Sequence, residues 1–510
     1  MGSAYLSMSQ TKIDSPPRAS SFGSTMRLSI PFLSRSPTRS SNTGPRYHRL
    51  NDQEDSGRVE EAQDEHLETD NEIFTELSVT RILRALRRKV LVFFVVLILV
   101  ILVVVVATRT RGNESEDDED DGPVWDDDSE YIADDARLEK YQTPSDAAYC
   151  APWLSTFNND YHNSENSKSI PTRARVSFDI PPQSELIFFI SRGQPTKGHF
   201  TMTSDRFTRI EKITVNVTAE YDDWRDLERT KVCFIDNDQE RGIMIWAGDD
   251  VPSLSPTFDI SVEIPWSRFQ DLSTDFSAGS YTQNLGDFFD IWNPIGFGIV
   301  RLKGRNEAIN SLGLFVESAF FRTTNAPVSA SFFSNDAVHI RTTNAPIESM
   351  VWAIGSHEEA ITEVSLRTND ASIRAALTMV SDFNVVKLNA ALHTTNGELN
   401  ITMPRMSVLG PEYTFALDAS TSNAASDVYL SPDYAGTFDL QTKHKGKTHV
   451  QYKDASDPWG KGRKHVFEME VDSERRKSGK VYWGNEVPKT MGAVRVKTTE
   501  RDVWLYTSPD

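Results

Sequence analysis

The chain has 510 residues, a net charge of −20, and 38% hydrophobic residues. This length exceeds that of one ordinary domain, so we expect segments of different character. We expect no nucleic-acid partner for so acidic a chain, and its two cysteines exclude a CxxC redox centre or a zinc ribbon.

The first 89 residues predict a cytosolic part. Residues 1–72 are rich in Ser, Thr, Pro and Arg, as in "SRSPTRSSNTG", and have few clustered apolar residues. Such a segment cannot offset the entropy of ordering, so we predict a disordered cytosolic tail. Residues 73–89 mix leucines with arginines and a lysine, which indicates a basic juxtamembrane segment at an anionic membrane surface.

Residues 90–107 read "VLVFFVVLILVILVVVVA", without a charge, a proline or a glycine. A helix of this length covers roughly 27 Å, close to the hydrocarbon thickness of a bilayer. Basic residues gather before it and acidic residues after it, so the positive-inside rule places the N-terminus in the cytosol. We predict a single-pass protein of the plasma membrane or an endomembrane, with its C-terminal part extracellular or lumenal.

Residues 108–146 predict an acidic stalk, extended by the repulsion of its like charges. The N-x-S/T acceptors Asn113, Asn216 and Asn400 all follow the span, and we expect them to be glycosylated. Cys150 and Cys233 lie on the same side. The sequence leaves open whether they form a disulfide or remain two buried thiols.

Residues 147–299 contain short apolar runs such as "SELIFFISRG" and "KITVNVTAEYDD", separated by Gly, Asp and Asn. Alternation at period two with β-branched and aromatic residues is typical of strands. We predict antiparallel pairing and a β-sandwich-like N-terminal part of the ectodomain.

Residues 300–510 carry an internal repeat, first as "RTTNAPV" at 322–328 and then as "RTTNAPI" at 341–347. Steps of about 19–27 residues predict the coils of a β-solenoid, with one chain corner per copy. The corner positions are Asn306, Asn325, Asn344, Asp370, Asn396, Asn423, His444 and Glu500.

Apolar residues on both sides of each corner are expected to face the core. They are Phe321, Ile340, Leu366 and Leu392 before the corner, and Val328, Ile347, Ile373 and Leu399 after it. Asn, Asp and Gly suit a corner because they tolerate positive φ. We also expect Thr hydroxyls and Asn amides to bond in ladders along the solenoid axis.

The tandem "RTTNAP" coils, with "LSTDF", "GDFFD" and "TKVCFI" before them, resemble fungal single-pass membrane proteins of uncharacterised function that carry an adhesin-like β-solenoid ectodomain. The resemblance covers roughly Cys150 to Asp510. It implies a β-solenoid surface module without known catalytic residues.

The functional prediction follows from this organisation. HExxH, GxSxG and P-loop motifs are missing from the sequence, so we expect no catalytic residues, cofactor or metal. We predict a non-catalytic, adhesin-like binding module for cell-wall polysaccharide or another surface protein. The alternatives are a lumenal polysaccharide-active enzyme and a membrane scaffold that acts through its cytosolic tail.

One basic stretch near the C-terminus is a candidate glycan contact, because charges attract anionic groups and rings stack on sugars. Its residues are Lys443, Lys445, Lys447, Tyr452, Trp459, Arg463 and Lys464. The alternative is a pair of solvated loops that cap the solenoid end, balanced by nearby acids such as Asp457.

Overall fold

The computed structural model describes residues 137–156, 172–204, 212–249, 256–265, 271–286, 296–355, 360–381, 385–403, 407–408, 412–485 and 492–507. The predicted tail, juxtamembrane segment and transmembrane helix lie outside these residues, as do Asn113 and most of the predicted stalk. No helix within the described ranges is long and apolar enough to cross a membrane. The chain divides into two units, 1–120 and 121–510, and every described residue belongs to the second.

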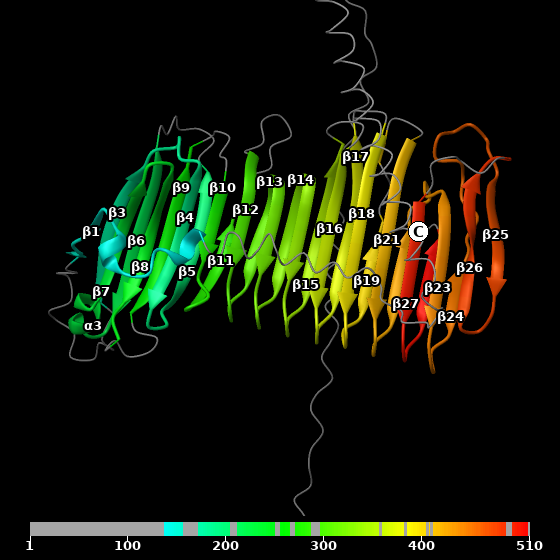
Figure 1. Cartoon of the computed structure of the whole chain (residues 1–510). Helices are drawn as coiled ribbons and strands as arrows, with labels where there is room; N and C mark the ends of the chain where they lie inside the picture. Colours follow the sequence, from blue (N-terminus) through cyan, green and yellow to red (C-terminus); the bar gives the residue numbers. More distant parts are fainter. Residues whose placement is uncertain are drawn as a thin grey trace, which may run out of the picture. The chain divides into compact units, whose positions relative to one another are not determined.

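The second unit is all-β and consists of two rows of strands, here called face A and face B (Figure 1). In spatial order, face A contains β7 (Thr230–Asn237), β8 (Glu240–Ala247), β4 (Leu186–Gly193), β10 (Asp271–Asp275), β12 (Gly296–Lys303), the C-terminal halves of β13 (Ile309–Arg322) and β14 (Val328–Arg341), β16 (Ile361–Thr368), β18 (Val385–Thr394), β21 (Glu412–Thr421), β27 (Gly492–Thr498), β23 (Gly436–Thr442), β26 (Arg476–Trp483) and β25 (His465–Asp472).

Face B contains β3 (Thr172–Ile180), β6 (Ile213–Tyr221), β9 (Thr257–Ile264), β5 (Lys197–Ser204), β11 (Ser280–Leu285), the N-terminal halves of β13 and β14, β15 (Ile347–Ile354), β17 (Ile373–Ser381), β19 (Leu399–Thr402), β22 (Ser426–Leu430), β28 (Val503–Thr507) and β24 (Thr448–Gln451). Short strands flank these rows: β1 (Tyr149–Ala151) on β7, β2 (Leu154–Thr156) on β3, and β20 (Ser407–Val408) on β17. Two short helices, η1 (Pro144–Asp146) and α3 (Trp224–Glu228), complete the described elements.

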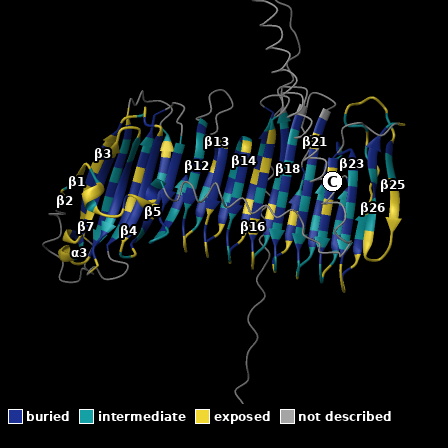
Figure 2. Ribbon diagram, viewed as in Figure 1, coloured by how far each residue is buried: buried dark blue, intermediate teal, exposed yellow. Residues whose placement is uncertain are grey.

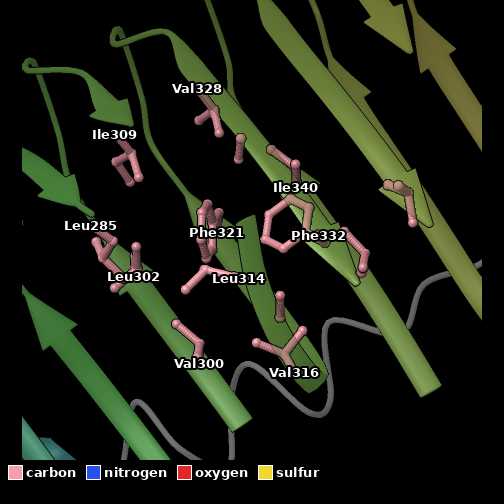
Figure 3. Packing of buried hydrophobic residues seen from close by; sticks show 14 of the residues in the cluster. Leu285, Val300, Leu302, Ile309, Leu314, Val316, Phe321, Val328, Phe332 and Ile340 are labelled. Atoms are coloured by element: carbon pink, nitrogen blue, oxygen red, sulfur yellow. The ribbon is translucent and has the colours of Figure 1, made fainter. Parts of the chain in front are cut away.

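Each coil of the repeat region runs along face A, turns at a Thr-Asn corner and returns along face B. Parallel register aligns Phe321 with Ile340, Leu366 and Leu392, and aligns Val328 with Ile347, Ile373 and Leu399. All eight side chains are at most 1% exposed. The predicted solenoid register is therefore confirmed, and Figure 3 shows part of the core between the two faces, including Phe321, Val328 and Ile340.

The expectation of antiparallel strands before residue 300 is wrong for much of that region. β3, β6 and β7 pair in antiparallel fashion, but β4, β5, β10, β11 and β12 already stack in parallel. Parallel strands such as β11 have one buried and one solvent-facing side, as the antiparallel strand β6 does, and this is visible as alternating colours in Figure 2. The sequence of such a parallel strand alternates like that of an antiparallel strand, and the period alone cannot distinguish the two.

The coil order in space differs from the chain order at the C-terminal end. β27 lies between β21 and β23 (Figure 1), and the pairing of the strands places β28 between β22 and β24. The last coil along the sequence is thus an internal coil of the stack. The hairpin of β25 and β26 pairs antiparallel with β23 and follows it in face A.

Residues 137–151 cover the outer side of face A at the other end. Tyr141 stacks on Phe188 of β4 with ring centroids 5.1 Å apart, and Arg137 Nε lies 2.6 Å from Glu240 Oε1 of β8. Burial would raise the pKa of Glu240, but hydrogen bonds from Lys140 and Arg137 outweigh it and lower that pKa to about 2. Cys150 and Cys233 form a disulfide between β1 and β7 (S–S 2.04 Å), which ties this segment to face A.

Candidate binding site on face A

The corners of the repeat carry a ladder of side-chain amides. Asn344 Nδ2 donates to Asn325 Oδ1 at 2.8 Å, and Asn325 Nδ2 donates to Asn306 Oδ1 at 3.0 Å. Asn396 donates to Asp370, and Asn423 donates to Asn396. The expected amide ladder is therefore confirmed.

The Thr hydroxyls also bond along the axis in several coils: Thr368 Oγ1 donates to the Ala345 carbonyl of the preceding coil at 3.1 Å, and Thr394 Oγ1 donates to the Ala371 carbonyl at 3.0 Å. Thr323 Oγ1 instead donates within its own corner, to the Ala326 carbonyl at 2.6 Å. One detail of the predicted corner chemistry is wrong. The corner Asn residues avoid positive φ, because Asp238 is the one non-glycine residue with positive φ among those described. Asn occupies the corner because its amide both donates and accepts along the stack.

A column of basic side chains follows the corners on the outer side of face A. Parallel register stacks them on consecutive strands, each the first residue of the repeated phrase or its equivalent. This cationic column consists of Lys303, Arg322, Arg341, Arg367 and His393. Neighbouring strands lie about 4.8 Å apart, so the column spans roughly 19 Å. Arg322 and Arg367 are exposed, and the other three side chains are half-buried.

The positive charges of the column shift the pKa values of two titratable side chains, His393 and Asp275. The pKa of His393 is lowered, first by burial and then by the charge of Arg367 on the neighbouring strand. At the other end, burial would raise the pKa of Asp275, but Arg192 and Lys303 outweigh it and lower that pKa. A row of like charges at strand spacing is unfavourable by itself, and the Asp275 carboxylate offsets part of this repulsion at Lys303.

An aromatic pair adjoins the column. Phe320 and His339 stand two residues before Arg322 and Arg341, and their rings stack with centroids 5.2 Å apart. The guanidinium of Arg301 lies 5.5 Å from the Phe320 centroid. Phe320 points outward, since it alternates with the core residues Ala319 and Phe321, yet it is only 3% exposed.

The sequence prediction of the site missed this column. The aligned phrases begin with Lys303, Arg322, Arg341, Arg367 and His393, so the signal is present in the sequence. It becomes a surface feature only when the parallel register places these positions side by side.

The structure does not bring the predicted basic stretch together. Lys443, Lys445 and Lys447 precede β24, whereas Tyr452 to Lys464 follow it. The strand separates Lys447 from Tyr452 by roughly 16 Å of extended backbone. The seven residues therefore form two surfaces at opposite ends of β24.

Acidic groups lie against several of these cations. Lys447 Nζ is 2.7 Å from Glu474, Lys445 Nζ is 3.6 Å from Glu500, and Arg463 Nη2 is 2.9 Å from Asp457. Arg463 also covers the Trp459 ring at 4.5 Å. These contacts agree with the alternative interpretation of two balanced loops near the solenoid end.

Face B carries stacked aromatic pairs near its C-terminal end. The rings of Tyr429 and Tyr506 stack at 4.5 Å, and those of His449 and Trp504 stack at 3.9 Å. Rings stacked along the axis use their faces on each other and present their edges outward. This arrangement is therefore a structural stack, and we do not assign it as a sugar platform.

The two described glycosylation acceptors differ in their surroundings. Asn400 is exposed on β19, between Arg374 and Asp427 on the neighbouring strands. Asn216 lies on β6 between two strands, and its Oδ1 accepts a hydrogen bond from Ser177 Oγ at 2.7 Å. Glycosylation at both residues stays a prediction. No cluster of three or more metal-ligating side chains occurs within the described part of the chain.

Comparison with known proteins adds little. No family model matches the chain, and no curated protein matches it. A "putative cell adhesion protein" from Clostridium sporogenes is 8% identical, with 66% of this chain and 100% of that chain covered and a TM-score of 0.15. A "putative adhesin" from Bacteroides fragilis is 9% identical, with 67% and 98% covered and a TM-score of 0.24. TM-scores this low support no conclusion about what the chain binds.

Proposed function

We propose that the chain is a non-catalytic binding module, anchored by residues 90–107, whose solenoid binds an acidic cell-wall glycan outside the cytosol. The cationic column is the observation that carries the proposal. Its side chains repeat at the strand spacing along one line, which suits an extended polymer with regularly placed anionic groups.

The residue types support a carboxylated or otherwise acidic polymer. Arg322, Arg341 and Arg367 supply planar guanidinium groups, which bind carboxylate or phosphate in two-pronged fashion and stay charged at any physiological pH. These three arginines lie on consecutive strands. A glycan chain running parallel to the solenoid axis meets them in succession.

The test compares two variants of equal charge change in the full-length protein in detergent. One is Arg322→Gln, Arg341→Gln and Arg367→Gln. The control is Lys231→Gln, Arg374→Gln and Lys461→Gln, three exposed cations away from the column. Retention on immobilised acidic polysaccharide at low salt is measured, where screening is weakest.

The column variant is expected to lose retention, while the control keeps it. Equal retention of the two variants contradicts the proposal. A loss found only after replacement of Lys443, Lys445, Lys447, Arg463 and Lys464 assigns binding to the loops around β24 instead. Release of soluble sugar product by the wild-type protein favours a polysaccharide-active enzyme.

A further inference from the structure

We propose that Asn396 is a site of spontaneous deamidation that the amide ladder holds in check. Asn396 and Gly397 form the one Asn-Gly pair in the sequence. Glycine has no Cβ, so it leaves its backbone nitrogen most open to the side chain of the preceding Asn. The proposal concerns a corner of the solenoid and goes beyond the proposed binding function, because it requires no ligand.

The reaction requires only the chain itself and water. The Gly397 backbone nitrogen loses its proton to hydroxide and attacks Asn396 Cγ, which forms a new C–N bond. The bond between Cγ and Nδ2 then breaks, and ammonia leaves after taking a proton from water. Water opens the resulting succinimide ring at either of its two carbonyl groups. One opening gives aspartate, and the other gives isoaspartate, in which the main chain runs through Cγ.

Close packing between coils explains why glycine follows Asn396. Gly397 is buried, and a Cβ at this position would overlap the Ala371 carbonyl of the preceding coil. A bulkier residue that would slow deamidation therefore does not fit. Three other corner amides, those of Asn325, Asn344 and Asn423, are each followed by alanine. The ladder thus contains one reactive Asn-Gly corner beside unreactive Asn-Ala corners.

The folded corner directs the two reacting groups away from each other. Asn396 Nδ2 donates to Asp370 in the preceding coil, and Asn396 Oδ1 accepts from Asn423 Nδ2 in the following coil. The Gly397 N–H donates to Thr394 Oγ1 at 3.1 Å, and this bond is buried. Ring closure turns the Asn396 side chain back toward its own backbone, which breaks both ladder bonds. Deamidation therefore requires local opening of the corner.

Deamidation changes the ladder permanently. A carboxylate at position 396 has no N–H to donate to Asp370, and it repels the carboxylate of that residue. The isoaspartyl product also adds one carbon to the main chain between β18 and β19, which are held in register with the preceding coil. A converted corner is therefore expected to open more readily than the original one.

Peptide mass spectrometry of the full-length protein in detergent tests the proposal. Incubation at pH 8 in water enriched in oxygen-18, with and without urea, labels the product formed before digestion. Labelled product at Asn396 is expected to form about tenfold or more slowly in the folded protein than in the unfolded one. Asn423→Ala removes one ladder bond, so it is expected to raise the folded-state rate about twofold to fivefold. The control Asn344→Ala removes the bond to Asn325 and is expected to leave the rate at Asn396 unchanged.

Three results overturn the proposal. Equal rates in the folded and the unfolded protein show that the corner does not protect Asn396. A lack of isoaspartate at this position in the unfolded protein shows that the succinimide does not form there. An unchanged folded-state rate in Asn423→Ala shows that the ladder is not the restraint. If Asn423→Ala does not fold, the comparison of folded and unfolded wild-type protein decides alone.

Discussion

At the scale of single residues, the amide ladder is interrupted at one position. In each of the four side-chain bonds of the ladder the later coil donates to the earlier one, as Asn344 does to Asn325 and Asn396 does to Asp370. A carboxylate has no N–H, so Asp370 can accept from Asn396 but cannot donate toward Asn344. The backbone there is regular, because Asp370 N bonds to the Thr343 carbonyl at 3.2 Å.

We therefore expect Asp370→Asn to stabilise the solenoid. The new amide supplies the missing donor, and a hydrogen bond at an exposed corner contributes about 0.5–1 kcal/mol. Asn396→Asp is the matched control and is expected to lower the free energy of unfolding, since it removes a donor and places two carboxylates together. Urea unfolding of both variants measures the effect, and a lower midpoint for Asp370→Asn contradicts this view of the ladder.

At the scale of elements, the hairpin of β25 and β26 ends the stack of face A with a charged strand. Most of β25 beyond Phe467 is exposed, and its Glu470 and Asp472 pair with Lys480 and Lys477 of β26. Charged side chains on an outer strand discourage pairing with another molecule. The hairpin thus serves as a cap of the solenoid.

The cap is expected to weaken in acid because of His465 at the start of β25. Its ring stacks on Trp483 at 4.3 Å and is buried, and burial lowers its pKa below the ordinary value of 6.5, although Asp454 acts in the opposite direction. The unfolded chain therefore binds a proton more readily than the folded one, so stability falls as the pH drops below about 6.5.

Hydrogen exchange of β25 and β26 between pH 7 and pH 5, corrected for the intrinsic rate, measures this effect. His465→Phe keeps the stacked ring and is expected to flatten the pH dependence, whereas His444→Gln at an exposed corner leaves it unchanged. An unchanged pH dependence in His465→Phe assigns the acid sensitivity to other groups.

At the scale of the whole second unit, antiparallel strands close both ends of the parallel stack. β7 and β6 pair antiparallel with β8 and β9 at one end, and β26 pairs antiparallel with β23 at the other. Between these ends, the last coil of the chain occupies an internal position. Val494, Val496, Val503 and Leu505 of this coil are all buried in the continuous core.

A chain that ends at residue 485 is therefore expected to lose the C-terminal part of the stack. In this shortened chain β21 and β23 lose β27, the strand that pairs with both of them. Four buried apolar side chains are removed as well, which lowers the free energy of unfolding by roughly 6 kcal/mol or more. Hydrogen exchange is expected to rise in β21 to β24 and to stay slow in β14 to β16. A chain that ends at residue 507 is the control, and equal protection in the two chains would refute the internal position of this coil.

Sequence alone predicts the local features of this protein. Side-chain alternation, the recurring Thr-Asn corner and the apolar residues around it depend on neighbours within a few positions, and they correctly predict β-structure, the solenoid and the inward set that includes Leu392 and Leu399. The column positions Arg322 and Arg341 are also present in the repeated phrase. Their alignment into a site requires the register between coils.

Only the tertiary structure determines the order and direction in which the strands pair. Parallel and antiparallel strands with one buried side have the same alternation, and the place of the last coil depends on which free strand edges remain when residues 492–507 return. The pairing of β24 likewise separates the basic residues before this strand from those after it. Short-range patterns determine which side of a strand is buried, whereas contacts between distant segments determine which charges become neighbours.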